Sequence, residues 1–184
     1  MIARLRQALG DAIEGDEQVR GQLIVRIGRE RLVDACRLLR DDPNLRFEHL
    51  SDVTAVDYLL HNPDGGRPGD GRTPRFDVVY HLYSIARGHR LRIKVGLDEA
   101  DPVLPSLVEL WPAANWGERE TFDMYGIEFS GHPNLTRILM PDDWQGNPLR
   151  KDYPLIEEEI EFTSTLDRLN ERRPSPGRLE GPAT

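Results

Sequence analysis

The amino-acid sequence predicts an α+β protein, a two-layer α/β sandwich whose helices cover one face of a mainly antiparallel sheet. Segments with helical spacing of apolar residues alternate with strand-like segments, in the order helix, strand, helix, strand, strand, strand, helix. Two of the strands flank a short Arg87-Gly88 turn, which indicates a β-hairpin. The regular pattern ends at Gly126, and a proline-rich segment follows. These observations place one folded domain before an extended C-terminal arm.

The first part of the chain is predicted to form a helix, a strand and a second helix. Apolar residues at helical spacing indicate a helix over residues 2–13 that ends near Gly15. The segment QLIVRI, residues 22–27, alternates as a strand does. A second apolar face over residues 29–40 indicates another helix. Cys36 lies on this face, so we expect it to be a buried hydrophobic residue and not a reactive thiol.

The central part is predicted to form three strands. β-Branched and aromatic residues over 47–60 indicate a strand with a possible bulge. The loop over residues 61–74 is rich in glycine and proline but lacks the spacing of a phosphate-binding loop. Residues 75–85 and 89–97 form the predicted hairpin. In its second strand apolar and basic residues alternate, so one face of the sheet is core and the other meets water or an acidic partner.

A final helix is predicted to begin at Asn115 and to end at Gly126. The Asn115 side chain is expected to cap the helix, while Glu118 reaches back to the same first turn. Arg119 and Asp123 are four residues apart, which is the spacing of an ordinary ion pair on a helix surface.

Composition excludes several classes of function. The chain has 184 residues and a formal net charge of −8, which argues against a surface that binds nucleic acid. It has one cysteine, so a disulfide framework, a four-cysteine zinc site and an iron–sulfur cluster held by this chain alone are excluded. No run of eighteen apolar residues and no signal-peptide pattern occurs, so we expect a cytosolic protein or one held to a membrane through partners.

One dense group of acidic and histidine residues could support an enzyme or a metal site: Glu118, Glu120, Asp123 and His132. Glu118 and Glu120 lie two residues apart on the predicted helix and therefore point in different directions. His81 and His89 have no cysteine or paired carboxylate at ligand spacing, so we interpret them as ordinary strand residues. Catalysis by this chain alone is disfavoured.

The segment after Gly126 is predicted to be an ordered arm that needs a second surface. Its prolines recur every six to eight residues, too often for a long helix. Its large apolar side chains distinguish it from a disordered segment. We therefore predict an α+β domain over residues 1–126, an arm over residues 127–155 that clasps a partner, and an acidic, proline-containing tail over residues 156–184. The charges of the arm are typical of an interface rim or, alternatively, of a solvated loop.

The segment from Glu118 to Leu155 reads ERETFDMYGIEFSGHPNLTRILMPDDWQGNPLRKDYPL. It resembles the signature of the C subunit of the proton-pumping NADH:quinone oxidoreductase, the respiratory complex I family. The resemblance extends upstream through VYHLYS (residues 79–84), LRIKVGL (residues 91–97) and LPSLVELWPAANW (residues 104–116). It covers about residues 20–155, and the main departure is Leu104 where the family pattern has valine. Residues 156–184 carry no comparable signal.

The resemblance implies a structural, assembly-essential subunit with no cofactor or catalytic residue of its own. It also implies a place in the peripheral arm of the complex, on the cytoplasmic side of the cell membrane, with FMN and iron–sulfur clusters held by other subunits. The implied neighbours are the large subunit that forms part of the quinone site and the small subunit that holds the terminal cluster. The expected interface residues are Glu118, Arg119, Asp123, His132, Leu135, Arg137, Ile138, Leu139, Trp144, Arg150, Lys151 and Asp152.

Two alternatives stay open at this point. Related domains occur in membrane-bound hydrogenases and in dehydrogenases with other electron donors, where this chain would have the same scaffold role. The other alternative is a stand-alone metal-dependent enzyme that uses Glu118, Glu120, Asp123 and His132.

Overall fold

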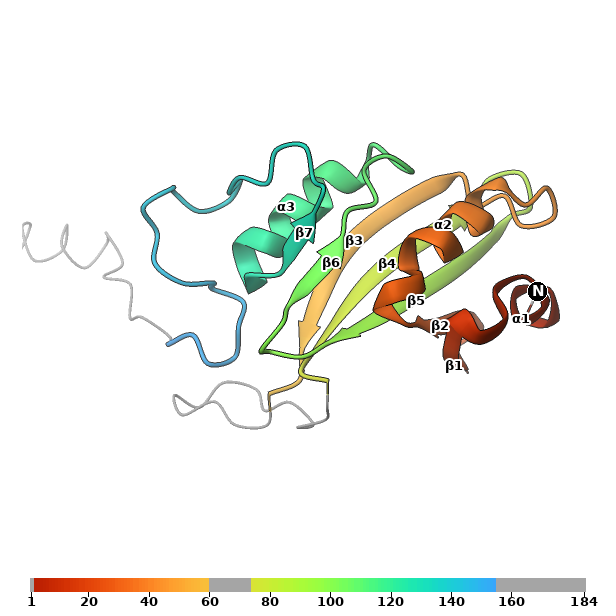
Figure 1. The fold of residues 1–184 in the computed structure, drawn as a ribbon, viewed down its shortest axis with the longest axis horizontal. Helices are drawn as coiled ribbons and strands as arrows, with labels where there is room; N and C mark the ends of the chain where they lie inside the picture. Colours follow the sequence, from red (N-terminus) through yellow and green to blue (C-terminus); the bar gives the residue numbers. More distant parts are fainter. Residues whose placement is uncertain (1, 60–73, 155–184) are drawn as a thin grey trace, which may run out of the picture. The chain divides into compact units, whose positions relative to one another are not determined.

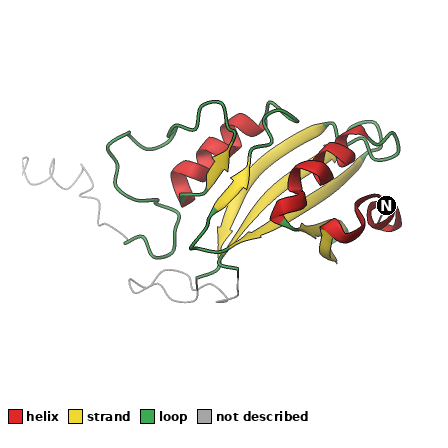
Figure 2. Ribbon diagram, viewed as in Figure 1, coloured by secondary structure: helices red, strands yellow, loops and turns green. Residues whose placement is uncertain are grey.

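A five-stranded sheet is the centre of the structure, a computed structural model that describes residues 2–59 and 74–154 (Figures 1 and 2). Its strand order is β1-β2-β5-β4-β3, and β2 and β5 are parallel while the other neighbours are antiparallel. The strands are β1 (Ile13–Val19), β2 (Gln22–Ile27), β3 (His49–Asp57), β4 (Phe76–Ser84) and β5 (His89–Leu97). The predicted α+β fold with a mainly antiparallel sheet is confirmed. The tail over residues 156–184 and the loop over residues 61–74, apart from Pro74, lie outside the described residues.

The predicted hairpin is present as β4 and β5. Their turn contains Gly88 at φ +66°, a left-handed conformation that glycine adopts without steric cost. The predicted bulge in β3 is also present, as a shift of register between Leu50 and Asp52. Along β5, Leu91, Ile93 and Val95 are fully buried, while the intervening residues are not. The alternation therefore separates a core face from an open face, as predicted.

The core face of the sheet is covered by helix α2 (Leu32–Asp41), by a small second sheet and by part of helix α3 (Ala114–Tyr125) (Figure 1). From α2, Leu32, Ala35, Cys36 and Leu39 enter the hydrophobic core, so the expectation for Cys36 is confirmed. The fully buried side chains of Leu32 and Leu39 each contribute about 1.5–3 kcal/mol to stability relative to an exposed leucine. Burial also raises the pKa of the Cys36 thiol, which keeps it un-ionised.

The N-terminal segment differs from its prediction. Helix α1 (Ile2–Leu9) and a 3-10 turn (Gly10–Ala12) end at Ala12, and residues 13–19 form strand β1, which was not predicted. The sequence IEGDEQV does not predict this strand, because apolar and polar residues hardly alternate in it and its side chains are mostly exposed. It pairs with β2 across a turn in which Arg20 and Gly21 both have positive φ. Such tight turns favour hairpins irrespective of the polarity of the strands.

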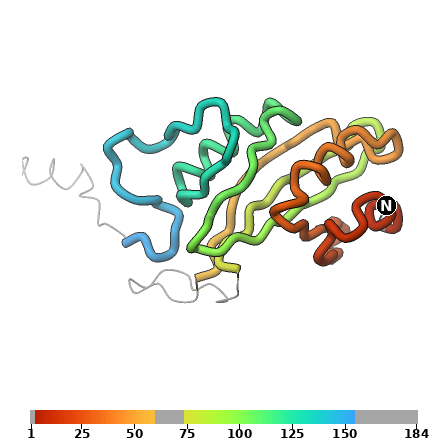
Figure 3. The backbone as a smooth tube through the Cα atoms, in the orientation of Figure 1, coloured from red at the N-terminus to blue at the C-terminus, as the bar shows by residue number. Residues whose placement is uncertain are grey.

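The chain around α3 is also more regular than predicted. Residues Val103–Pro105 form β6 and residues Glu128–Ser130 form β7, and the two pair in parallel. Leu104 and Phe129 from this pair are buried in the core. The prediction that regular structure ends at Gly126 was wrong, because β7 follows it. Both strands were missed because three residues are too few to show a periodic pattern of apolar residues. After β7 the chain is irregular, as Figure 3 shows for the arm up to residue 154.

Candidate functional site

Helix α3 carries a fully buried carboxylate, Glu118, on the side that faces the chain between β6 and α3. Its Oε2 accepts a hydrogen bond from Ser106 Oγ at 2.6 Å, and its Oε1 accepts one from the backbone N–H of Leu107 at 2.7 Å. Burial raises the pKa of Glu118 to about 7, although both hydrogen bonds act in the opposite direction. The group therefore titrates close to neutral pH.

The predicted capping arrangement at the start of α3 was wrong. The helix begins at Ala114, and the preceding Ala113 makes no side-chain capping bond. Asn115 lies inside the first turn, where its side chain cannot occupy the capping position. Since Glu118 points toward Ser106 and Leu107 instead, it links two segments of the fold.

A second buried carboxylate of α3, Asp123, binds the arm. Its Oδ2 accepts hydrogen bonds from three consecutive backbone N–H groups, those of Ile138, Leu139 and Met140, at 3.0, 2.8 and 3.0 Å. Its Oδ1 accepts a bond from Arg137 Nη1 at 2.7 Å. Burial alone would raise the pKa of Asp123, but these four bonds hold it below the usual value. The carboxylate is thus a fixed anion that orders residues 137–140.

The predicted pair between Arg119 and Asp123 was therefore also wrong. Arg119 lies nearer the surface and donates to Thr136 O at 3.0 Å, to Thr136 Oγ1 at 2.9 Å and to Arg137 O at 3.2 Å. Helical spacing allowed the pair, but the arm offers both side chains better partners. Nearby, the His132 ring is within hydrogen-bond distance of Asn115 O.

The C-terminal end of α3 is capped by the arm. Asn147 Nδ2 donates to Phe122 O at 3.4 Å and to Asp123 O at 3.0 Å, and the N–H of Leu149 donates to Met124 O at 3.1 Å. These bonds satisfy carbonyls that a helix end leaves without partners. Gly126 ends the helix at φ +72°, and a Cβ there would lie 2.6 Å from Asn147 Oδ1. The predicted end of the helix at Gly126 is confirmed.

The last described part of the arm is tied to the sheet through a buried arginine. Arg75 pairs with Asp57 through two bonds, at 3.0 and 2.8 Å, and with Asp152 through two more, at 3.1 and 2.8 Å. The N–H of Lys151 donates to Asp57 Oδ2 at 2.9 Å. Glu99 also accepts a bond from Arg75. The carboxylates hold the pKa of Arg75 above its ordinary value against the effect of burial.

The structure thus gives most of the predicted interface residues an intrachain contact. Arg137 and Asp152 form ion pairs within the chain, and Leu135 packs against the hydrophobic core. Ile138 and Trp144 are half-buried, whereas Leu139 is 58% exposed. The indole N–H of Trp144 is buried and has no acceptor in the described part of the chain. Arg150 lies over the Phe76 ring at 5.1 Å. The interface itself stays a prediction.

The four residues considered for a metal site do not converge. Glu118 points to Ser106, Asp123 points to the arm and Glu120 is exposed. Among residues 2–59 and 74–154, no group of three or more histidine, cysteine, aspartate or glutamate side chains is placed to hold a metal ion.

Sequence reasoning missed Asp57, Arg75 and Asn147. The first of these left a signal, because Asp57 is in phase with Val53 and Ala55 on the core face of β3. A carboxylate on a buried face requires a charged or hydrogen-bonding partner. The partners Arg75 and Asp152 are far away in the sequence and could not be named from it.

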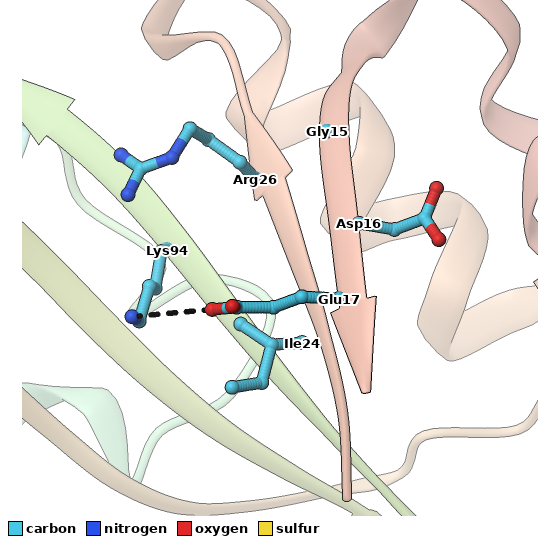
Figure 4. A pocket seen from close by; sticks show the side chains of 6 residues that line it. All are labelled: Gly15, Asp16, Glu17, Ile24, Arg26 and Lys94. Carbon is cyan, nitrogen blue, oxygen red and sulfur yellow. Dashed lines mark ion pairs between the residues drawn. The ribbon is translucent and has the colours of Figure 1, made fainter. Parts of the chain in front are cut away.

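The open face of the sheet has a groove beside β1, lined by Gly15, Asp16, Glu17, Ile24, Arg26 and Lys94 (Figure 4). Glu17 and Lys94 point toward each other across it, with 3.7 Å between their charged atoms, whereas Asp16 points away. Arg26 is bonded to Asp77 at 2.7 and 2.9 Å. The charges of this groove are therefore largely paired within the fold.

No helix in the described residues is long and apolar enough to cross a bilayer. The comparisons with known proteins agree with one another. A family model described as the respiratory-chain NADH dehydrogenase 30 Kd subunit matches residues 25–159. The C subunit of the NADH-quinone oxidoreductase of Roseiflexus castenholzii is 53% identical over 174 residues, which cover 95% of this chain and 94% of that protein. The same subunit of Citrifermentans bemidjiense is 47% identical over 154 residues, which cover 84% of this chain and 88% of that protein.

Two solved structures are similar in fold. The trypsin-resistant fragment (1–134) of Nqo5 has a TM-score of 0.57 at 33% sequence identity, over 73% of this chain and 98% of that chain. A chain of the membrane-bound sulfane sulfur reductase, an archaeal respiratory membrane complex, has a TM-score of 0.62 at 20% sequence identity. The match covers 96% of this chain and 94% of that chain. At 20% identity the second likeness concerns the fold alone.

Proposed function

This chain belongs to the family of the 30 Kd subunit of respiratory-chain NADH dehydrogenase, and from this premise we propose that it is a scaffold subunit of a proton-translocating NADH:quinone oxidoreductase. In the proposed role it holds no cofactor and supplies no catalytic residue. Electrons would pass from NADH through FMN and iron–sulfur clusters in other subunits to quinone. The chain would lie in the peripheral arm of the complex, on the cytoplasmic side of the cell membrane.

The observation that carries the proposal is the 53% identity to the C subunit of such an enzyme over 95% of the chain. The site geometry is consistent with a scaffold role. The two buried carboxylates of α3 are both committed to holding other segments, Glu118 to residues 106–107 and Asp123 to residues 137–140. An acid or base used in turnover has to reach a substrate, whereas these groups are fully buried.

We propose that the arm over residues 127–155 contacts the large quinone-site subunit and the small cluster-bearing subunit. Asp123 and the cluster of Arg75 with Asp57 and Asp152 fix the backbone of the arm before it binds. Less conformational entropy is therefore lost when the arm associates with a partner. Leu139 then stands exposed on an ordered backbone. Trp144 of the same arm is half-buried, so part of its side chain is left for a partner to cover.

The proposal is tested by affinity purification of the tagged chain from native membranes solubilised in a mild detergent. We expect flavin, iron–sulfur subunits and inhibitor-sensitive NADH:quinone activity in the eluate. A membrane complex without NADH activity would instead assign the chain to a complex with another electron donor. Recovery of the chain alone would contradict a subunit role of either kind.

A further inference from the structure

A groove of about 230 Å³ lies between the edge strand β3, helix α3 and the arm. Its apolar lining comes from Leu50 and Val53 of β3, Trp116 of α3 and Ile138 of the arm. Gly117 allows the close approach of α3 to β3, because a Cβ at this position would lie 2.9 Å from Val53 Cβ. The groove is therefore built by three segments that are distant in the sequence.

Trp116 is exposed but held in place. It is 65% exposed, and the guanidinium carbon of Arg119 lies 5.1 Å from its ring centroid. Arg119 is itself fixed by its bonds to Thr136 and to the carbonyl of Arg137. An exposed tryptophan whose orientation is already set loses little entropy on binding, and tryptophan is enriched among the residues that dominate interface energies.

The charged residues that line the groove itself are both acidic. Asp52 of β3 and Glu120 of α3 line the groove, and both are exposed. Neither forms an ion pair within residues 2–59 and 74–154. His81 lies opposite Asp52 in the sheet. The cation Arg119 lies over the Trp116 ring, but its hydrogen bonds go to the arm and not to Asp52 or Glu120. The groove is thus complementary to a positive charge next to an apolar side chain.

We propose that this groove binds a segment of a neighbouring subunit in which an apolar side chain lies next to a lysine or arginine. The inference rests on the proposed function and adds to it a particular surface and the chemistry of the partner. The apolar side chain packs against Trp116 and Ile138, and the cation lies between Asp52 and Glu120. A second copy of this chain is a poorer fit, because its net charge is −8.

The test places the photo-crosslinker p-benzoylphenylalanine at position 116 in the chain within the assembled complex. The matched control places it at Ile85, which is also 65% exposed but does not line the groove. We expect position 116 to crosslink another subunit several-fold more than position 85 does. The crosslinked peptide should contain an apolar residue beside lysine or arginine.

Charge reversal tests the electrostatic part. Asp52→Lys combined with Glu120→Lys should lower the crosslink yield from position 116 by about tenfold, which corresponds to about 1.4 kcal/mol. Glu128→Lys changes an exposed carboxylate of β7 outside the groove and should leave the yield unchanged.

Three results would overturn the inference. A complex that contains the chain at full stoichiometry but shows no crosslink from position 116 would reject the groove while leaving the proposed function intact. A crosslink to a second copy, or to a peptide without lysine or arginine, would reject the partner chemistry. Absence of the chain from any complex would reject the proposed function as well.

Discussion

Replacing Asp123 by asparagine removes a charge from the point where α3 holds the arm. The carboxylate accepts three backbone bonds from residues 138–140 and one from Arg137, and its side chain is fully buried. Breaking a buried charge pair costs roughly 3–5 kcal/mol. Arg137 retains 20% exposure and can regain water, so we expect the lower end, about 3 kcal/mol.

The assay is urea unfolding of the full chain, combined with hydrogen exchange of the amides of residues 138–140. Asp143→Asn is the control, because it alters an exposed carboxylate of the same arm and should leave stability nearly unchanged. The pKa of Asp123 is lowered in the folded state. Its contribution is therefore present above the unfolded pKa, about 3.9, and is lost as the pH falls through the folded value.

The reasoning would be refuted by an Asp123→Asn variant with unchanged stability at neutral pH and unchanged protection of these amides. Such a result would mean that the arm is held by its other contacts, and that the four bonds to Asp123 add nothing measurable.

Three further predictions concern stability. Burial raises the pKa of Glu118 to about 7, so ionisation of this carboxyl group opposes folding. Relative to Glu118→Gln, the wild type should therefore lose about 3 kcal/mol of unfolding free energy as the pH rises from about 4.5 to 7, and an equal pH dependence of urea unfolding in the two proteins would contradict this. Gly126→Ala should lower the melting temperature more than Gly131→Ala does, because both have positive φ but only Gly126 lacks space for a Cβ; equal losses would reject the steric account. Arg75→Met should cost about 3–5 kcal/mol in urea unfolding, whereas Arg29→Met, at an exposed pair, should change little; similar effects would argue against a special role for the buried cluster.

The elements that sequence predicted well are those whose signal is local. The hairpin over residues 75–97 and the core face of β5 follow from alternation between neighbouring residues. Strand β1 was missed because a polar edge strand has no such alternation. Strands β6 and β7 were missed because three residues do not establish a period.

The roles of charged residues were predicted less well than the elements that carry them. Helical spacing suggested that Arg119 pairs with Asp123, but both bind the arm. The ion pair within the helix was physically allowed, but the hydrogen bonds to the arm formed in its place. The long-range partners of Asp57 could not be identified from one sequence, because Asp152 reaches it only through the folded arm and Arg75.

The central claim is that this chain contributes to the enzyme complex by assembly and not by chemistry. The most direct measurement is NADH:quinone turnover per flavin in complexes that contain the Leu139→Ala, Trp144→Ala double variant. We predict fewer assembled complexes with unchanged turnover in each, because in the proposed role these side chains contact a partner subunit and do not take part in the reaction. A full amount of complex with slower turnover would contradict the account and would give the chain a direct part in the reaction.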